Sequence, residues 1–196
     1  LVGSEMCIRD RYVDTTKDRL YCDSVTSVRR RATLTAMTII FKALCRLLAP
    51  ILAFTADEAW EYAGYEGSVH EQDFPAPMPE YDTQEASSVV SRLLEIKSVI
   101  QVAIEEQVKA KTFSKNNEAD IRLTVPSNES EDVVALLEDR AFCTEFFIIA
   151  DLSVQTGPEL AATALRTEHA MCPRCRRYEP EEEGADVCER CSEVLS

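Results

Sequence analysis

Four cysteines near the carboxyl end of the sequence have the spacing of a metal site. Cys172 and Cys175 form the pattern C-P-R-C, twelve residues follow, and Cys188 and Cys191 form the pattern C-E-R-C. Two C-x-x-C turns let four thiolates reach one ion with tetrahedral geometry. The pattern predicts one structural zinc; the alternative is two disulfides in a secreted module, while iron–sulfur sites use other spacings. Because sulfur would fill every position, no water could be activated, so we expect a metal that stabilises the fold.

Other residues near these cysteines admit more than one role. Four thiolates on one Zn²⁺ carry a net charge of −2, which nearby cations can offset while still reaching a phosphate. The cations in question are Arg174, Arg176, Arg177 and Arg190. His169 is not needed as a ligand, because four cysteines already complete the shell. We interpret Cys22, Cys45 and Cys143 as small buried hydrophobic residues.

The rest of the sequence contains no recognisable catalytic constellation. There are two histidines, at positions 70 and 169, and no serine lies in a glycine-rich elbow. Neighbouring acids such as Asp57 and Glu58 point about 100° apart on a helix, which is typical of caps or of a solvated face. We therefore predict no catalytic residue in this chain.

Composition limits the class of protein. The chain has 196 residues, 45% of them hydrophobic, with only 5 Gly and 8 Pro, which favours long helices and a folded core. The net charge of −14 excludes a uniformly basic nucleic-acid coat, so any phosphate contact must come from local patches. No apolar run approaches the ~20 residues of a membrane span, and we expect no membrane partner.

Hydrophobic spacing predicts a helical first part. From Ser24 to Leu48 there is no Gly or Pro, and apolar residues recur at steps of three and four. We expect one buried helix face with neighbours on two sides, ended by Pro50. Thr55 to Glu58 has the form of a capping box that starts a short helix carrying Trp60. The stripe on the long helix consists of Leu34, Met37, Ile40, Phe41, Leu44, Leu47, Leu48 and Ile51.

The pattern changes further along the chain. After a loop from Gly64 to Pro79, a second long helix is predicted to run to about Lys109, with Asp82 and Glu85 as cap candidates. The alternation over Ile121 to Val125 predicts a strand. Glu131 to Arg140 fits a short helix, and Phe146 to Val154 fits a covered strand.

These elements give a mainly α fold class. We expect a helical-bundle domain over residues 12–111, a small α+β subdomain over 112–169 and a four-cysteine zinc ribbon over 170–196. Residues 1–11 have neither an apolar signal core nor a helical or strand period, and we interpret them as a non-native or disordered leader that contains Cys7. The acidic run Glu179 to Glu183 is predicted to be a solvated loop.

Several motifs, in order, resemble one protein family. Tyr12 to Asp23 (YVDTTKDRLYCD), the arginines at 29–31 and Leu48 to Trp60 (LAPILAFTADEAW) closely resemble the anticodon-binding helical domain of bacterial-type isoleucyl-tRNA synthetases. Ser68 to Pro75 (SVHEQDFP), the run EADIRLTV and the terminal cysteines are similar to the later segments of that family. Valyl, leucyl and methionyl relatives share the helical domain, and the ribbon is what favours isoleucine.

The resemblance implies a function for the intact protein. That protein would be a cytoplasmic ligase that uses ATP and Mg²⁺, in a catalytic domain missing here, to attach isoleucine to its tRNA. This chain alone would be inactive and would bind the anticodon stem-loop, with that catalytic domain as its partner in the same polypeptide. Candidate tRNA contacts are Arg29, Arg30, Arg31, Lys109, Lys111, Lys115, Arg176 and Arg177.

One departure and one alternative accompany this resemblance. The family usually places a tryptophan directly after the second cysteine of the first pair, where this sequence has Arg176. An aromatic ring there could stack on a base, whereas arginine stacks more weakly or binds phosphate. The alternative function is a non-enzymatic zinc-ribbon module that binds protein, with the helices as its scaffold.

Overall fold

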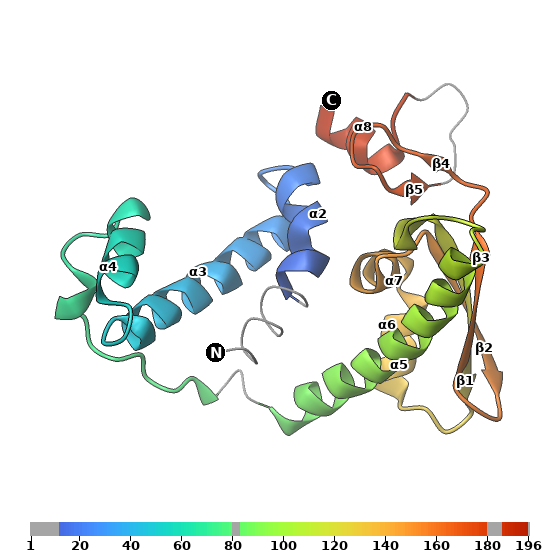
Figure 1. The fold of residues 1–196 in the computed structure, drawn as a ribbon, viewed down its shortest axis with the longest axis horizontal. Helices are drawn as coiled ribbons and strands as arrows, with labels where there is room; N and C mark the ends of the chain where they lie inside the picture. The colour runs from blue at the N-terminus through green and yellow to red at the C-terminus, as the bar shows by residue number, and fades with distance from the viewer. Residues whose placement is uncertain (1–11, 80–82, 180–185, 196) are drawn as a thin grey trace. The chain divides into compact units, whose positions relative to one another are not determined.

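The computed structural model describes residues 12–79, 83–179 and 186–195 of the chain. It confirms the expected class: a mainly helical protein with small sheets and a carboxyl-terminal cluster of four cysteines. Packing divides the chain into two units (Figure 1). Unit 1 comprises Leu1–Asp23 and Thr83–Ser196, and unit 2 comprises Ser24–Asp82. The four-part division by residue range stays a prediction, and the leader 1–11, Asp82 and residues 180–183 of the acidic run lie outside the described residues.

Unit 2 is built on one long helix, α3 (Val28–Leu48). Its N-cap is Ser27, whose hydroxyl accepts a hydrogen bond from the Arg30 amide, and it ends before Pro50 as predicted. The shorter helix α4 (Ala53–Tyr62) and the 3-10 turn η2 (Val69–Glu71) pack against it. The core that these elements share is small and consists of Cys45, Ala49, Ala56, Trp60 and Val69.

The predicted burial of the α3 stripe is wrong in part. Leu34, Leu47 and Ile51 are exposed, while Phe41 is half-buried against the small core. Among residues 24–79, the partners of α3 are one short helix and one 3-10 turn, which cover too little of its surface to bury a stripe that runs its whole length. The helix itself is confirmed, but not the neighbours on two sides.

The capping box at Thr55 is also wrong. Helix α4 begins at Ala53, so Thr55 lies inside its first turn, and no side chain caps its start. Asp57 instead reaches out of the helix: its Oδ1 accepts hydrogen bonds from Ser68 Oγ at 2.6 Å and from the Val69 amide at 3.0 Å. These bonds lower the pKa of Asp57, the one from Ser68 contributing most. The carboxylate therefore fastens η2 to α4.

Unit 1 contains the predicted second long helix, α5 (Gln84–Lys109). Its cap is Thr83, whose hydroxyl accepts from the Ala86 amide; Glu85 lies in the first turn and is not the cap. The three-four spacing buries one face of α5, as predicted. Beyond it follow the 3-10 turn η4 (Asn116–Glu118) and β1 (Ala119–Pro126), in which alternate residues are buried. The buried residues of α5 are Leu93, Ile96, Ile100, Ala103 and Ile104.

A three-stranded sheet forms the centre of unit 1. Strand β1 pairs in parallel with β2 (Asp151–Gly157) and antiparallel with β3 (Ala161–Arg166), giving the order β2-β1-β3. Helices α6 (Glu131–Glu138) and α7 (Arg140–Phe147) connect the two parallel strands. Helix α5 packs on β3 (Figure 1), and α7 packs on β2. Their apolar side chains join those of β1 in one core.

The predicted strand over Phe146 to Val154 is wrong at its start. Phe146 and Phe147 end helix α7, Ile148 takes the left-handed conformation with φ 58°, and β2 begins only at Asp151. Asp139 starts the helix by accepting a hydrogen bond from the Phe142 amide. Phe142 and Phe146, one helical turn apart, stack with ring centroids 5.3 Å apart, which favours the helix over an extended chain.

The remaining elements lie at the two ends of the described chain. Helix α2 (Asp14–Cys22) precedes unit 2, and the carboxyl end forms β4 (Ala170–Met171), β5 (Tyr178–Glu179) and helix α8 (Glu189–Leu195). The name ribbon refers below to residues 170–179 and 186–195. Within the described part of the chain, no helix combines the length and the apolar character needed to cross a membrane.

Candidate metal centre

The first cysteine pair lies in a tight turn between two short strands. Strands β4 and β5 pair antiparallel, with Met171 opposite Tyr178. Cys172 closes the turn, because its amide donates to the Arg177 carbonyl at 2.9 Å and its carbonyl accepts from the Arg176 amide at 2.8 Å. Arg176 adopts φ 60°, a left-handed conformation that lets the chain double back over so few residues. The turn points the two sulfurs of this pair to one side.

The second pair stands at the start of helix α8. Cys188 precedes the helix and its carbonyl accepts from the Ser192 amide at 2.9 Å, while Cys191 lies in the first turn and is fully buried. A residue three positions further along a helix lies on the same face, so both sulfurs turn toward the first pair. The four sulfurs lie within 4.8 Å of one another, the cluster that the spacing predicts.

The distances fit a tetrahedral ion better than disulfides. Zn–S bonds of ~2.3 Å place the corners of a tetrahedron ~3.8 Å apart, and the sulfurs of Cys175 and Cys188 are 3.7 Å apart. A disulfide needs ~2.05 Å, and all four cysteines are free thiols in the structure. The donor set is four sulfurs, which suits zinc.

Backbone amides prepare one thiol for metal binding. Burial of Cys172 favours its neutral form, but hydrogen bonds from the amides of Cys175, Cys188 and Arg174 outweigh this and lower its pKa to about 6. The Cys188 amide lies 3.4 Å from its sulfur. These hydrogen bonds favour the thiolate form of Cys172. Burial is the largest influence on Cys175 and Cys188, and it raises the pKa of both thiols.

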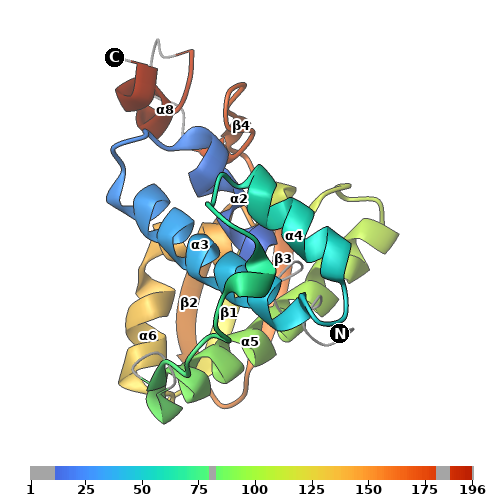
Figure 2. The same cartoon turned by 90° about the vertical axis from the view of Figure 1, so that its left-hand side faces the viewer.

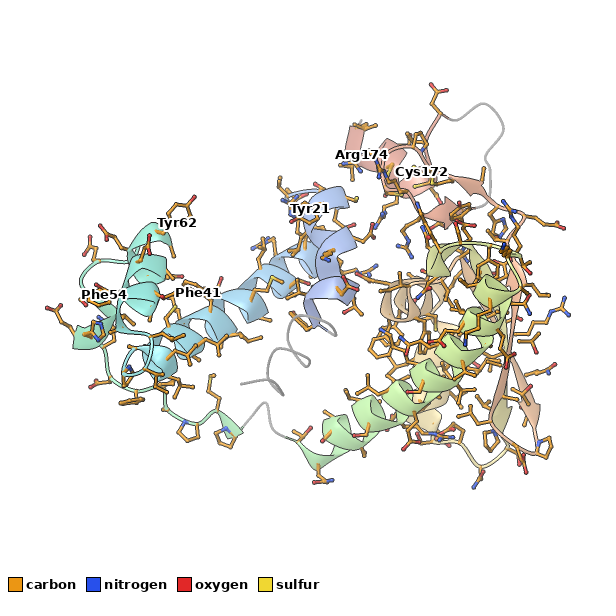
Figure 3. The ribbon with its side chains drawn as sticks, in the orientation of Figure 1. Tyr21, Phe41, Phe54, Tyr62, Cys172 and Arg174 are labelled. Carbon is orange, nitrogen blue, oxygen red and sulfur yellow. The ribbon has the colours of Figure 1, made fainter. Side chains whose placement is uncertain are left out.

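Three of the four arginines near the cluster are engaged inside unit 1. Arg174, which is labelled in Figure 3, donates from Nη1 to the Cys22 carbonyl at 2.9 Å and to the sulfur of Cys191 at 3.3 Å. Arg190 pairs with Asp18 and Asp23. Arg177 pairs with Asp18 at 3.3 Å and with Glu179 at 3.6 Å, and also bonds Thr144. The structure thus shows all three cations bound to other protein groups, and Arg174 also to a sulfur of the cluster.

The fourth arginine, Arg176, differs from the other three. Its side chain is exposed, and within the described residues its guanidinium makes no ion pair. Its carbonyl accepts a hydrogen bond from Asn117 Nδ2 at 3.2 Å, which ties the turn to η4. Arg176 thus stays available to a ligand, as its candidate role requires.

Cys22, Cys45, Cys143 and His169 lie outside the cluster of four. Cys143 and Cys45 are buried, as predicted; burial is the main cause that raises the pKa of Cys143 to about 12. Cys22 is only half-buried, and burial, then the charge of Asp18, raises its pKa to about 11. These values keep both thiols protonated at neutral pH, which fits a packing role.

The other predicted tRNA contacts are distributed over both units. Arg29 and Arg31 are exposed and Arg30 is half-buried at the start of α3 in unit 2. In unit 1, Lys109 pairs with Glu105 at 3.6 Å, and Lys111 and Lys115 are exposed beyond the end of α5. Their contacts with RNA stay a prediction.

Acidic residues of α2 meet the ribbon, although no sequence pattern marks them as part of the site. Asp18 and Asp23 bind Arg190 across more than 160 residues of sequence. A separation of that length leaves no local pattern; the one signal is that both acids belong to the YVDTTKDRLYCD motif.

Comparison with known proteins shows which family the chain resembles. Residues 5–123 match the family described as the anticodon-binding domain of tRNA ligase. Similar proteins include the isoleucine–tRNA ligase of Methylacidiphilum infernorum, 30% identical over 190 residues. Isoleucine–tRNA ligase 2 of Burkholderia mallei is 32% identical over 196 residues, and the isoleucine–tRNA ligase of Brevibacillus brevis is 32% identical over 205.

The matches cover most of this chain but a small part of each relative. Each of the three alignments covers 94% of this chain and only 19% to 21% of the relative, so the chain spans about a fifth of the length of the curated relatives it matches. The family match covers more than half of the chain and includes α2, α3, α4 and α5. The chain therefore belongs to the family of anticodon-binding domains of tRNA ligases.

Proposed function

We propose that this chain is the tRNA-binding, carboxyl-terminal part of an isoleucine–tRNA ligase. The observation that carries the proposal is the similarity to isoleucine–tRNA ligases along 94% of the chain, which extends well beyond the family match at residues 5–123. The chain binds the anticodon stem-loop of isoleucine tRNA in the cytoplasm. Activation of isoleucine with ATP and Mg²⁺ takes place in a catalytic domain of the same polypeptide, so this chain alone is inactive.

We further propose one structural zinc in the ribbon, held by Cys172, Cys175, Cys188 and Cys191. When bound, the zinc supplies a cross-link between the two cysteine pairs. The free state of the four thiols and the distances between their sulfurs support this assignment. The arginines beside the cluster offset the negative charge of a four-thiolate site, and the donation from Arg174 to the Cys191 sulfur is one such contact.

The candidate contacts to RNA are cations at several places on an acidic chain. With a net charge of −14, binding to phosphate requires local clusters of positive charge, and the start of α3 provides one in Arg29, Arg30 and Arg31. Three successive helical residues point in three directions, so one or two of them reach RNA. Lys109, Lys111, Lys115, Arg176 and Arg177 are the candidates in unit 1.

The salt dependence of tRNA binding tests the RNA part of this proposal. We expect the logarithm of the affinity of the chain for isoleucine tRNA to fall linearly with the logarithm of salt concentration, with a slope of about −0.7 to −0.9 per phosphate contacted. Arg31→Gln should reduce that slope by about 1 if Arg31 contacts phosphate. The matched control is Arg122→Gln, which removes an exposed arginine from β1 and should leave the slope unchanged.

Two results would contradict the RNA proposal. One is the absence of tRNA binding at low salt, and the other is binding that does not weaken as salt rises. Either result favours the alternative, a non-enzymatic ribbon module that binds protein. Equal effects of Arg31→Gln and Arg122→Gln on the slope would show that Arg31 does not contact phosphate. The RNA proposal would then be judged by the salt dependence of the wild-type chain.

Metal content tests the zinc part. We expect about one zinc per chain, and loss of the metal in Cys188→Ser, because three thiolates no longer close the site. Cys45→Ser is the matched control: it removes a buried cysteine of unit 2, outside the cluster, and should keep the metal. A Cys188→Ser chain that keeps full zinc would contradict the assignment.

A further inference from the structure

The acidic face of helix α2 meets the arginines of the ribbon. The Asp18 carboxylate lies between two guanidinium groups: its Oδ1 is 2.9 Å from Arg190 Nη2, and its Oδ2 is 3.3 Å from Arg177 Nη1 and also bonds Arg190 Nη1. Arg190 Nη1 reaches Asp23 Oδ1 at 3.2 Å as well. These side chains retain between 9% and 27% of their exposure. Figure 2 shows α2 beside the ribbon.

A third arginine joins the end of α2 to a metal ligand. Arg174 donates to the carbonyl of Cys22, the last residue of α2, and to the sulfur of Cys191. The final carbonyls of a helix have no partner within the helix and carry partial negative charge, so a cation is favourable there. One side chain thus contacts both the helix and the cluster.

Helix α7 also contacts α2. Arg19 forms an ion pair with Glu145, whose side chain is 3% exposed. Arg177 extends this connection, since it bonds Thr144 on α7 as well as Asp18 on α2. Helix α2, only 9 residues long, is too short to be stable in isolation, so its contacts with the ribbon and with α7 determine its order.

The three ribbon arginines can make these contacts only when the cysteine turns are formed. Arg174 lies between the ligands of the first pair, Arg177 follows that pair, and Arg190 lies between the ligands of the second. A structural zinc site of this kind is unfolded without its metal, and the arginines then lose their fixed positions. Metal binding and the order of α2 are therefore thermodynamically linked, and the linkage is reciprocal.

We propose that Asp18 is a positioning residue that couples the four-cysteine site to helix α2, so that a bound metal orders the helix and the ordered helix tightens the metal. This inference rests on the proposed zinc site and does not depend on RNA binding. The charge state of Asp18 supports it: burial alone would raise the pKa of this carboxyl, but the hydrogen bonds and charges of Arg190, with the charge of Arg177, lower it. The carboxylate is ionised at neutral pH and binds both arginines as a charged partner.

The test compares Asp18→Asn with Asp14→Asn in the full chain. Both substitutions remove one negative charge from α2, but the ion pair of Asp14 is with Lys17 on the same helix, and both of those side chains are about half exposed. Zinc affinity is measured by competition with a chelator, and protection of the α2 amides by hydrogen exchange and mass spectrometry. A cobalt-substituted sample reports whether the site keeps tetrahedral sulfur coordination.

We expect removal of zinc from the wild-type chain to lower the protection of α2 amides by about tenfold or more, and Asp18→Asn to weaken zinc binding about tenfold. The cobalt spectrum of Asp18→Asn should stay that of a four-thiolate site, because no ligand is changed. In Asp18→Asn, α2 protection should be low with or without zinc. Asp14→Asn should change zinc affinity less than about twofold, since exposed pairs contribute little.

A double substitution separates a direct contact from a general effect on folding. Asp18→Asn combined with Arg190→Gln should weaken zinc binding by less than the sum of the two single losses, because both substitutions remove the Asp18–Arg190 pair, although each also removes a contact of its own. Additive losses would mean that Asp18 does not act through Arg190.

The two proposals fail in different ways. If the wild-type chain takes up no metal, the zinc assignment is wrong, and the coupling with it. If the metal binds but α2 protection in Asp18→Asn responds to zinc as in the wild type, the zinc site stands and the role of Asp18 is overturned.

Discussion

Arg92 on helix α5 and Glu129 in the loop after β1 form an ion pair with several hydrogen bonds. Arg92 Nε lies 3.2 and 3.0 Å from the two carboxylate oxygens of Glu129, and Nη2 lies 2.7 Å from Oε2. The Glu129 side chain is 8% exposed, and that of Arg92 is 29% exposed. Arg92 also pairs with Glu95 at 2.8 Å, but that acid is 65% exposed. Glu129 and Glu95 thus pair with the same arginine, but Glu129 is buried and Glu95 is exposed.

The contacts of Glu129 determine how much unfolding free energy Glu129→Gln should remove. Hydrogen bonds to charged groups contribute about 1.5 to 3 kcal/mol each, and the amide keeps one oxygen that can still accept from Arg92. Because Arg92 remains partly solvated, we expect a net loss of about 2 kcal/mol of unfolding free energy, below the value for a fully buried pair. Glu95→Gln, the matched control, should cost less than about 0.5 kcal/mol.

The assay is hydrogen exchange of the β1 amides, which lie in the same core as α5. A loss of about 2 kcal/mol should raise their exchange rates about thirtyfold at pH 7, whereas Glu95→Gln should leave them within about twofold. Fluorescence of Trp60, the single tryptophan, reports on unit 2 and is unsuitable for this purpose.

The pH dependence provides a second test of the same pair. Hydrogen bonds from Arg92 are the main cause that lowers the pKa of Glu129 below its ordinary value of 4.5. A carboxyl with a lowered folded-state pKa stabilises the protein above the unfolded-state pKa, and the contribution is lost as pH falls through the folded-state value. The difference between wild type and Glu129→Gln should shrink in acid below about pH 4.5. Equal exchange in Glu129→Gln and Glu95→Gln would show that the buried pair contributes no more than the exposed one.

Further predictions concern the core, one strained residue and one thiol. Leu123→Ala at a fully buried position of β1 should lower the unfolding free energy by about 2 to 5 kcal/mol, whereas Arg122→Ala on the exposed face of the same strand should change it by less than about 0.5, both measured by urea unfolding. Lys111 adopts φ 60°, so Lys111→Gly should raise the unfolding free energy by about 1 kcal/mol, while Lys115→Gly, at φ −133°, should not raise it. Cys143, fully buried and with its pKa raised to about 12, should resist iodoacetamide at pH 8 until the chain is unfolded, as mass spectrometry of labelled peptides can check; rapid labelling of the native chain would contradict this.

Sequence spacing predicts the elements whose pattern is local. Helix α5 follows the three-four spacing from its first buried residue to Lys109, and β1 follows strict alternation, because each buries one face against a continuous core. The spacing of the four cysteines predicts the cluster that the structure shows, since two short C-x-x-C turns can bring four sulfurs together.

Other features depend on contacts that no local pattern encodes. The stripe of α3 has helical spacing, yet the number of elements available to cover it is a property of the whole unit. The four consecutive apolar residues at 146–149 fit a strand and the end of a helix equally well. The stacking of Phe142 on Phe146 and the cap at Asp139 favour the helix. Asp18, the partner of Arg177 and Arg190 on α2, lies more than 150 residues away from both in sequence, so this contact is visible only in three dimensions.

Our main proposal is that this chain binds isoleucine tRNA selectively and that the selectivity depends on zinc in the ribbon. Measuring the binding of two tRNAs, with and without zinc, tests this proposal directly. The quantity to measure is the affinity of the full chain for isoleucine tRNA and for valine tRNA at the same salt concentration, before and after removal of zinc. We predict tighter binding of isoleucine tRNA, by a margin that decreases when zinc is removed. Equal binding of the two tRNAs with zinc present would contradict the proposed function.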